Sequence, residues 1–161
     1  RLCRTLAAVV LAAMAMILAG CSDEPETGPV PIKYGRDTCD FCRMIISDPR
    51  FAAEVRRGRG EKVAKFDDLG EGLVWLRQRE WKDEPAVEIW VMDSATGKTW
   101  LDARKAFFVP VGQTPMGFNY GAVSEQRPGA LTFEEYRTTT LKRAVDNYCG
   151  PMNASLVEPH R

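Results

Sequence analysis

Cysteine and methionine side chains gather in the six-residue run Cys39-Asp40-Phe41-Cys42-Arg43-Met44. Because two residues separate the thiols, both sulfurs can converge from one tight turn. Cys42 and Met44 are two positions apart, so their side chains share a face wherever the backbone is extended. Thiolates and thioethers are soft donors that select Cu(I) over hard cations. The run therefore predicts a sulfur site for Cu(I).

Three other interpretations of Cys39 and Cys42 stay open on chemistry alone. A disulfide between them would close a tiny loop, and such bridges are usually redox-active. A four-thiolate zinc site would need a second cysteine pair, whereas only Cys149 remains outside the N-terminal region. A thioredoxin-like dithiol would precede a helix, but here the run continues with Met44-Ile45-Ile46 and ends at Ser47-Asp48-Pro49.

Two further sulfur sites lie downstream. Met116 belongs to the turn sequence Thr114-Pro115-Met116-Gly117, which would present its side chain on a loop. The alternative is a surface or gap-filling methionine, the commoner fate of this residue type. Cys149-Gly150-Pro151-Met152 follows the last expected helix. It is a copper-binding pair, a contact for a partner or an incidental thiol in a tail.

The remaining residues argue against an enzyme. The single histidine, His160, is interpreted as part of a solvated tail, so one chain cannot assemble the multi-histidine sites typical of catalytic zinc or Cu(II). No Ser/His/acid set is present, and Asp67 and Asp68 more simply cap a helix than perform acid–base chemistry. The segment Asp93–Thr99 ends like a P-loop but lacks the leading glycine, and we expect a β-turn there. No catalytic residue is predicted.

The first residues have the pattern of a lipoprotein export signal. Arg1 and Arg4 precede the apolar stretch Leu6–Ala19, which is too short for a comfortable transmembrane helix. Leu18-Ala19-Gly20-Cys21 resembles a bacterial lipobox. We therefore expect residues 1–20 to be a signal peptide and Cys21 to be the lipidation site, because two acyl chains suffice for stable anchoring.

Charge and composition predict one soluble domain that does not bind nucleic acid. Residues 1–20 carry two of the 22 basic side chains and none of the 22 acidic ones, so the rest of the chain has a formal charge of −2. That balance offers no basic patch for nucleic acid. We expect residues 21–36, rich in Pro, Glu, Asp and Gly, to be a flexible tether. Residues 37–148 would form the domain, and residues 149–161 a C-terminal tail.

Alternating strands and helices must position the sulfur residues. The pattern predicts a strand pair, Phe51–Arg57 and Lys62–Phe66, joined at Gly58-Arg59-Gly60. A helix capped at Asp67 or Asp68 follows and ends by Trp81. Further strands are expected at Ala86–Met92, Lys98–Leu101, Phe107–Val111 and Phe118–Val123, and a capping box at Thr132 and Glu135 opens a helix to about Asn147. The order indicates an α+β fold with mostly antiparallel sheets, organised as two ββαβ-like halves.

The ordered set of these motifs resembles the NosL family, the accessory lipoproteins of nitrous-oxide reductase maturation. The resemblance covers about residues 37–140 and includes the lipobox. It rests on Cys39–Glu54, Lys65-Phe66-Asp67-Asp68, Trp90-Val91-Met92-Asp93, Trp100-Leu101-Asp102-Ala103 and Pro115-Met116-Gly117.

The resemblance implies a two-part ββαβ-type fold and the binding of Cu(I) for delivery to the copper–sulfide centre of nitrous-oxide reductase, outside the cytoplasm. By position it implies Cys39, Cys42, Met44 and Met116 as the metal set. Many relatives have glycine where this chain has Arg43, and we expect that cation to lower the pKa of the neighbouring thiols. Cys149 and Met152 fall outside the family pattern.

The leading hypothesis is a monomeric or weakly dimeric Cu(I) chaperone anchored by lipid on the periplasmic face of a bacterial membrane. Its partner would be nitrous-oxide reductase or the maturation machinery of that enzyme. Ser22 after the acylated Cys21 favours the outer membrane. The alternative is a periplasmic thiol–disulfide oxidoreductase using Cys39 and Cys42, and a third hypothesis is a structural lipoprotein whose sulfurs merely pack.

Overall fold

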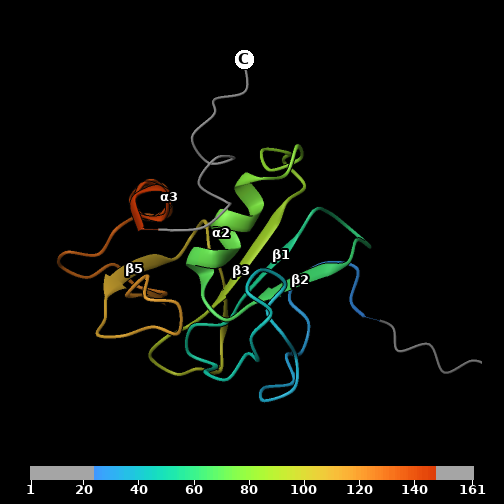
Figure 1. Cartoon of the computed structure of the whole chain (residues 1–161), viewed down its shortest axis with the longest axis horizontal. Coiled ribbons are helices and arrows are strands. Elements are labelled where there is room, and N and C mark those ends of the chain that lie inside the picture. The colour runs from blue at the N-terminus through green and yellow to red at the C-terminus, as the bar shows by residue number, and fades with distance from the viewer. Residues whose placement is uncertain (1–23, 148–161) are drawn as a thin grey trace, which may run out of the picture.

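Two helices and two small antiparallel sheets make up the described part of the protein, residues 24–147 of a computed structural model. The larger sheet has the strand order β2-β1-β3-β4, and β5 pairs with β6 in a separate hairpin. The elements are β1 (Ala53–Arg56), β2 (Val63–Phe66), α2 (Leu69–Arg77), β3 (Glu88–Met92), β4 (Trp100–Asp102), β5 (Phe107–Pro110), β6 (Tyr120–Val123) and α3 (Phe133–Asn147). Figure 1 shows this arrangement, which confirms the predicted α+β class.

Helix α2 packs against β1 and β2 of the larger sheet. Its apolar positions Leu69, Leu73 and Leu76 follow helical spacing and are buried, as the sequence predicts. Asp68 is the N-cap, and the helix ends at Arg77, earlier than the predicted limit at Trp81. This packing fixes the first turn of α2 beside the end of β2, where the candidate site lies.

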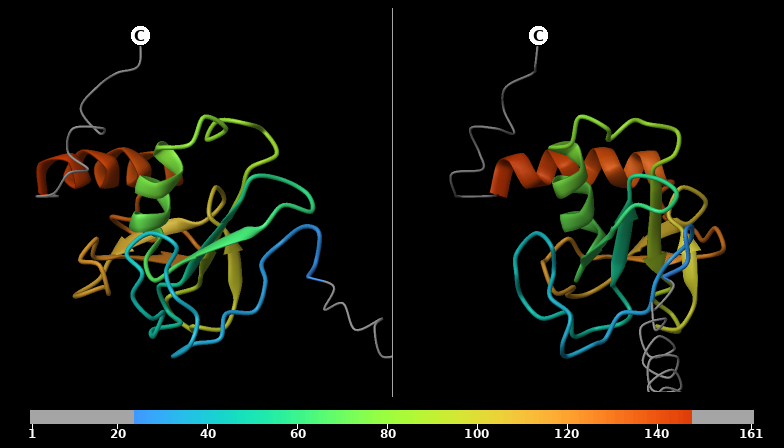
Figure 2. Two further views of the ribbon diagram at one scale, coloured as in Figure 1. Left: turned by 45° about the vertical axis from the view of Figure 1, so that its right-hand side comes forward. Right: turned by 90° about the vertical axis from the view of Figure 1, so that its right-hand side faces the viewer.

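The second half of the chain supports α2 from the other side. Helix α3 packs against α2 and β5, and Figure 2 shows it lying beside α2 above the sheets. The predicted capping box is confirmed: the Glu135 carboxylate accepts from the Thr132 amide at 2.8 Å. The ring of Phe108 in β5 stacks on Tyr136 of α3 at 4.2 Å between centroids.

The predicted pair of ββαβ halves is confirmed only for the first half. β1, β2, α2 and β3 form a ββαβ unit, in which β3 returns to pair with β1. The second unit consists of β5, β6 and α3, and within residues 24–147 no strand follows α3. The loop Asp93–Thr99 joins β3 to β4 as a turn, as expected, with the Gly97 amide bonded to the Asp93 carbonyl at 2.7 Å.

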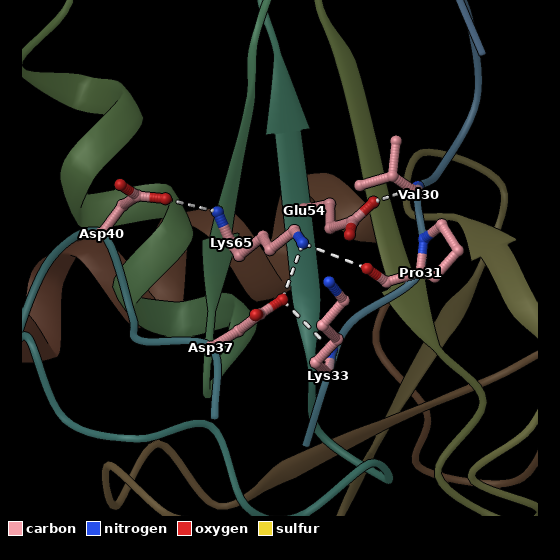
Figure 3. Close-up of polar contacts among 7 residues, drawn as sticks. All are labelled: Val30, Pro31, Lys33, Asp37, Asp40, Glu54 and Lys65. Carbon is pink, nitrogen blue, oxygen red and sulfur yellow. Dashed lines mark hydrogen bonds and ion pairs between the residues drawn. The ribbon is translucent and has the colours of Figure 1, made fainter. Parts of the chain in front are cut away.

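The segment predicted to be a flexible tether is bonded to the sheet from Pro25 onward, which corrects that expectation. We call residues 24–32 the strap. The Arg56 guanidinium donates to the Pro25 carbonyl at 2.6 Å and to the Gly28 carbonyl at 2.9 Å. Val30, only 2% exposed, donates its amide to Glu54 Oε2 at 2.8 Å (Figure 3).

Strand alternation explains why the strap is held so firmly. Ala53 and Val55 of β1 face the apolar core, so Glu54 and Arg56 must point to the opposite face of a central strand. There the strap supplies backbone partners for both buried charged side chains. Composition alone did not reveal this, because the strap is itself rich in proline and acidic residues.

Several predictions concern residues outside the described range. These are the signal peptide, the lipidation site Cys21 and the C-terminal tail with Cys149, Met152 and His160. Within residues 24–147, neither helix is long and apolar enough to cross a lipid bilayer.

Candidate metal centre

The Cys-x-x-Cys run forms the tip of a narrow hairpin. Thr38 and Ile45 are bridged in antiparallel fashion. Beyond this bridge, the Cys39 amide donates to the Met44 carbonyl at 2.8 Å, and the Arg43 amide donates to the Cys39 carbonyl at 3.1 Å. Arg43 adopts a φ of 67°, in the left-handed region that disfavours side chains other than glycine. The loop is therefore closed by its own backbone.

Asp40 attaches this hairpin to β2. Because β2 is an edge strand, the outward peptide groups of Lys65 have no strand partner. The Asp40 amide donates to the Lys65 carbonyl, and the Lys65 amide donates to Asp40 Oδ2, each at 2.8 Å. The Lys65 ammonium also bonds Asp37 Oδ2 at 2.7 Å (Figure 3). The thiol loop is thus held to the sheet at two points.

The hairpin brings both thiols to a carboxylate of α2. The sulfurs of Cys39 and Cys42 and a carboxylate oxygen of Glu71 all lie within 4.8 Å of one another. The Cys39 thiol donates to Glu71 Oε2 at 3.0 Å, and the Phe41 amide donates to the Cys39 sulfur at 3.4 Å. Because metal–sulfur bonds are about 2.3 Å long, donors around one ion stand up to about 4.6 Å apart. The three groups are already close to metal-binding separation.

Glu71 is held rigidly in the first turn of α2. The Asp68 carboxylate caps this turn by accepting from the Gly70 amide at 2.9 Å. Glu71 is completely buried, and within the described residues its Oε1 has no hydrogen-bond partner. An unpaired buried acceptor costs about 1–3 kcal/mol. The donor set therefore fits a cation, which would supply the missing partner.

Burial keeps the thiols protonated in the absence of metal. It raises the pKa of Cys39 to about 12, and the hydrogen bond to Glu71 acts in the same direction. Burial likewise raises the pKa of the half-buried Cys42. The pKa of the Glu71 carboxyl is also raised by burial, against the lowering effect of its bonds to both thiols. Metal binding must therefore displace protons from sulfur.

The expectation that Arg43 lowers the thiol pKa values is wrong. The Arg43 side chain is 75% exposed and its guanidinium lies 3.9 Å from Asp40, in a weak ion pair. The pKa values of both thiols rise instead, because desolvation of the sulfur dominates. A cation in solvent is screened too strongly to offset that burial.

Met44 occupies the outer side of the hairpin. It is 49% exposed, whereas Cys39 is fully buried and Cys42 lies between these extremes. The three sulfur residues of the run thus differ in their access to solvent, in the order Cys39, Cys42, Met44. The described cluster contains the two thiols and Glu71, and Met44 stays a predicted ligand.

Met116 lies on a loop that is tied to the helix of Glu71. The Thr114 hydroxyl and the Met116 amide both donate to the Asp68 carboxylate, which is the N-cap of α2. The Met116 side chain is half-buried and packs on a small cluster that Phe41 of the thiol loop also contacts. The predicted ligand Met116 is therefore placed in the same neighbourhood as the thiols.

Glycine at position 70 permits this close approach. A Cβ built on Gly70 would stand 2.2 Å from the ring of Phe118, which follows the Met116 loop. The loop therefore rests directly on the first turn of α2, and a side chain at position 70 would push it away. Gly117, with a φ of 74°, closes the turn by donating its amide to the Thr114 carbonyl at 3.0 Å.

Sequence reasoning identified both thiols but missed Glu71. Asp68 and Glu71 have the spacing of a capping pair, so the sequence offers an ordinary explanation for the carboxylate. A carboxylate two residues from Leu69 and Leu73 in an otherwise apolar helix could have suggested burial. Only the packing of α2 against the thiol loop reveals its partner.

No protein-family model matches this chain, and no curated protein matches its sequence. Among solved structures, the chain is similar to the crystal structure of the copper chaperone NosL from Shewanella denitrificans, with a TM-score of 0.52 and 23% sequence identity. The similarity covers 72% of this chain and 89% of that one. The predicted NosL-like fold is therefore confirmed.

Proposed function

From the fold that this chain shares with a copper chaperone, we propose that the protein is a Cu(I)-binding metallochaperone and not an enzyme. The single observation that carries the proposal is the convergence of Cys39, Cys42 and Glu71 within 4.8 Å. Soft sulfur donors favour Cu(I), Zn²⁺ and iron–sulfur clusters over hard cations. Among these, the fold shared with a copper chaperone favours Cu(I). Met44 and Met116 are the additional donors that we propose for the bound ion.

The gradient of exposure suits a cargo that must be handed on. Cys39 anchors the site in the core, while Cys42 is half-buried and Met44 is 49% exposed. An acceptor's donors can approach from the exposed side and bind copper before Cys39 releases it. A thioether carries no proton and binds more weakly than a thiolate. The bond between copper and Met44 is therefore suited to break first.

We further propose the destination and the location of the protein. Copper would be delivered, outside the cytoplasm, for assembly of the copper–sulfide centre of nitrous-oxide reductase, either to the enzyme or to its maturation machinery. The lipobox ending at Cys21 supports anchoring by lipid on the periplasmic face of a membrane, with Ser22 favouring the outer membrane. These steps rest on the sequence motifs and on the resemblance that they carry.

The geometry favours a metal carrier over a thiol–disulfide oxidoreductase. Reactive thiols have a lowered pKa and commonly lie at a helix N-terminus. Here burial raises the pKa of both thiols, and the hairpin is followed by extended chain rather than by a helix. A resting thiol of this kind is a poor nucleophile and needs a metal to displace its proton.

Competition with a coloured Cu(I) chelator under reducing conditions tests the proposal. The wild-type protein should bind one Cu(I) tightly. Cys39→Ser and Cys42→Ser should each weaken binding by more than the about 10–100-fold that is typical of changes outside the ligand set. Glu71→Gln should weaken Zn²⁺ binding more than Cu(I) binding, because a carboxylate is a hard donor.

A matched control and a redox assay make the outcome decisive. Ser47→Ala, on an exposed side chain of the same hairpin region, should leave Cu(I) binding unchanged. A wild-type protein that reduces insulin disulfides but retains no copper would contradict the chaperone and support the oxidoreductase. Equal Cu(I) affinity in wild type and in both serine variants would exclude this site.

A further inference from the structure

The strap is attached to the sheet at several points between Pro25 and Pro31. In addition to the bonds from Arg56 and Glu54, the Gly28 amide donates to Glu88 Oε2 at 2.7 Å. The Lys65 ammonium donates to the Pro31 carbonyl at 3.0 Å (Figure 3). Three neighbouring strands, β1, β2 and β3, thus contribute a side chain to the strap, which moves with the domain.

The start of the strap lies beside the turn between β1 and β2. The Gly60 amide donates to the Glu26 carbonyl at 2.8 Å, and the Arg59 guanidinium pairs with the Glu26 carboxylate. Figure 1 shows the blue start of the described chain emerging next to this turn. The chain therefore enters the domain at the turn, residues 57–62.

The candidate metal centre lies at the opposite end of the same strand pair. β2 leaves the turn at Val63, ends at Phe66 and leads directly into the first turn of α2, which carries Glu71. The left view of Figure 2 shows the chain entry and the β1–β2 turn on one side and the beginning of α2 on the other. The domain thus has an entry end and a metal end.

The chain available between Cys21 and the first clamp is short. The first clamp is the Pro25 carbonyl, which accepts from Arg56. Cys21 precedes Pro25 by four residues, which span at most about 14 Å when fully extended. A domain of about 120 residues is about 35 Å across. A freely moving segment from 21 to 36 would instead reach about 50 Å. Because the strap is packed, a lipid anchor at Cys21 leaves too little free chain for the domain to turn its metal end toward the membrane.

We propose that the strap holds the domain against the phospholipid headgroups with the β1–β2 turn facing them, so that the metal end points away from the membrane. This orientation rests on the proposed lipid anchor at Cys21. The turn exposes Arg57, Arg59, Glu61 and Lys62. Arg57 pairs with Glu84 and Arg59 pairs with Glu26, so positive and negative charges alternate on this surface, which suits zwitterionic headgroups. Copper is then presented to acceptors that approach from the aqueous compartment.

Amide NMR of the full, lipidated protein in nanodiscs tests the orientation. The discs contain phosphatidylethanolamine and phosphatidylglycerol with a fraction of headgroup-spin-labelled lipid. Signals of Gly58, Gly60 and Glu61 should be strongly broadened, while those of Asp40 and Arg43 keep their intensity. Equal broadening at both ends, or broadening of the thiol loop alone, overturns the proposal.

A linker insertion separates the strap from other causes of orientation. About twelve Gly and Ser residues placed between Asp23 and Glu24 add about 40 Å of reach, so the contrast between the two ends should disappear. The same insert between Glu125 and Gln126, in an exposed loop, is the matched control and should preserve it. If the difference in broadening between the two ends persists after the insertion between Asp23 and Glu24, the strap does not set the orientation and the proposal is overturned.

Two measurements on the same sample distinguish this inference from the proposed function. Mass spectrometry determines whether Cys21 carries acyl chains, and chelator competition measures Cu(I) binding. Copper binding without orientation overturns the inference alone, and orientation without copper binding overturns the chaperone function alone. An unmodified Cys21 overturns the anchor and the orientation together, while leaving copper binding to be judged separately.

Discussion

The Thr114 hydroxyl donates a 2.6 Å hydrogen bond to Asp68 Oδ2, across 46 residues of sequence. Both groups are buried, and Asp68 is also the N-cap of the helix that carries Glu71. One carboxylate therefore fixes two parts of the candidate site: the first turn of α2 and the loop that presents Met116.

Thr114→Val should destabilise the protein because it keeps the shape of the side chain and removes the buried hydroxyl. Loss of a hydrogen bond to a buried charged group costs about 1–3 kcal/mol. Urea denaturation of the metal-free protein measures the change. Thr138→Val, on the exposed face of α3, should alter stability by less than about 0.5 kcal/mol. Similar losses in both variants would contradict a special role for the Thr114–Asp68 bond.

Met116→Leu should weaken Cu(I) binding by about tenfold, equivalent to about 1.4 kcal/mol, because it removes a thioether while preserving most of the packing volume. Chelator competition gives the affinity, and sulfur coordination can be followed by X-ray absorption. Met92→Leu, buried in β3, changes a methionine that lies in the core and should leave the affinity intact. If Met116→Leu binds copper as the wild type does, Met116 is not a ligand.

Arg43→Gly should stabilise the thiol loop. Arg43 has a φ of 67°, a conformation that is sterically costly for arginine but not for glycine. The ion pair between Arg43 and Asp40 is too exposed to offset the cost to arginine. Relief of the left-handed conformation is worth about 1–2 kcal/mol. The greater freedom of glycine in the unfolded chain offsets part of this, so we expect a net gain of up to about 1 kcal/mol in the free energy of unfolding. Arg43→Ala removes the same ion pair but retains a Cβ, so it should bring no gain. Equal effects of the two substitutions would point to charge rather than to backbone conformation.

Stability should fall as the pH rises through the range in which Glu54 titrates. Burial raises the pKa of Glu54 to about 7, above the value of 4.5 expected for an ordinary glutamate. Between these two pH values the folded protein binds the proton more tightly than the unfolded chain does, so unfolding becomes easier as pH increases. The full effect is about 3 kcal/mol at most, present below pH 4.5 and lost by about pH 7.

Urea denaturation at closely spaced pH values checks the Glu54 prediction. Glu54→Gln keeps an acceptor for the Val30 amide and should flatten the dependence between pH 4.5 and 7. Glu84→Gln, on a half-exposed side chain that pairs with Arg57, is the control and should preserve the slope. A slope that persists unchanged in Glu54→Gln would assign the effect to another group.

Local patterns were sufficient for most of the fold. The helix caps and the turn at Gly58-Arg59-Gly60 each depend on residues that are neighbours in sequence. The Thr132 cap and the turn were predicted at their observed places, and the first cap was narrowed to Asp67 or Asp68, of which the structure uses Asp68. The same holds for the thiol pair, whose spacing requires one tight loop. The observed strand ends differ from the predicted ones by a few residues. The reason is that hydrogen bonding to the neighbouring strand, rather than local preference, decides where a strand ends.

The sequence by itself determined which soft donors the chain possesses, that Cys39 and Cys42 share one loop, and the order of helices and strands. Only the tertiary structure decided that Glu71 meets Cys39 across 32 residues, that Asp68 holds the Met116 loop, and that the strap is packed rather than free. The reason is that a donor pair or a cap is set by backbone geometry within a few residues. Contacts between distant segments depend on which faces the core buries, and a polar segment such as the strap becomes ordered only because the buried Glu54 and Arg56 require its backbone as a partner.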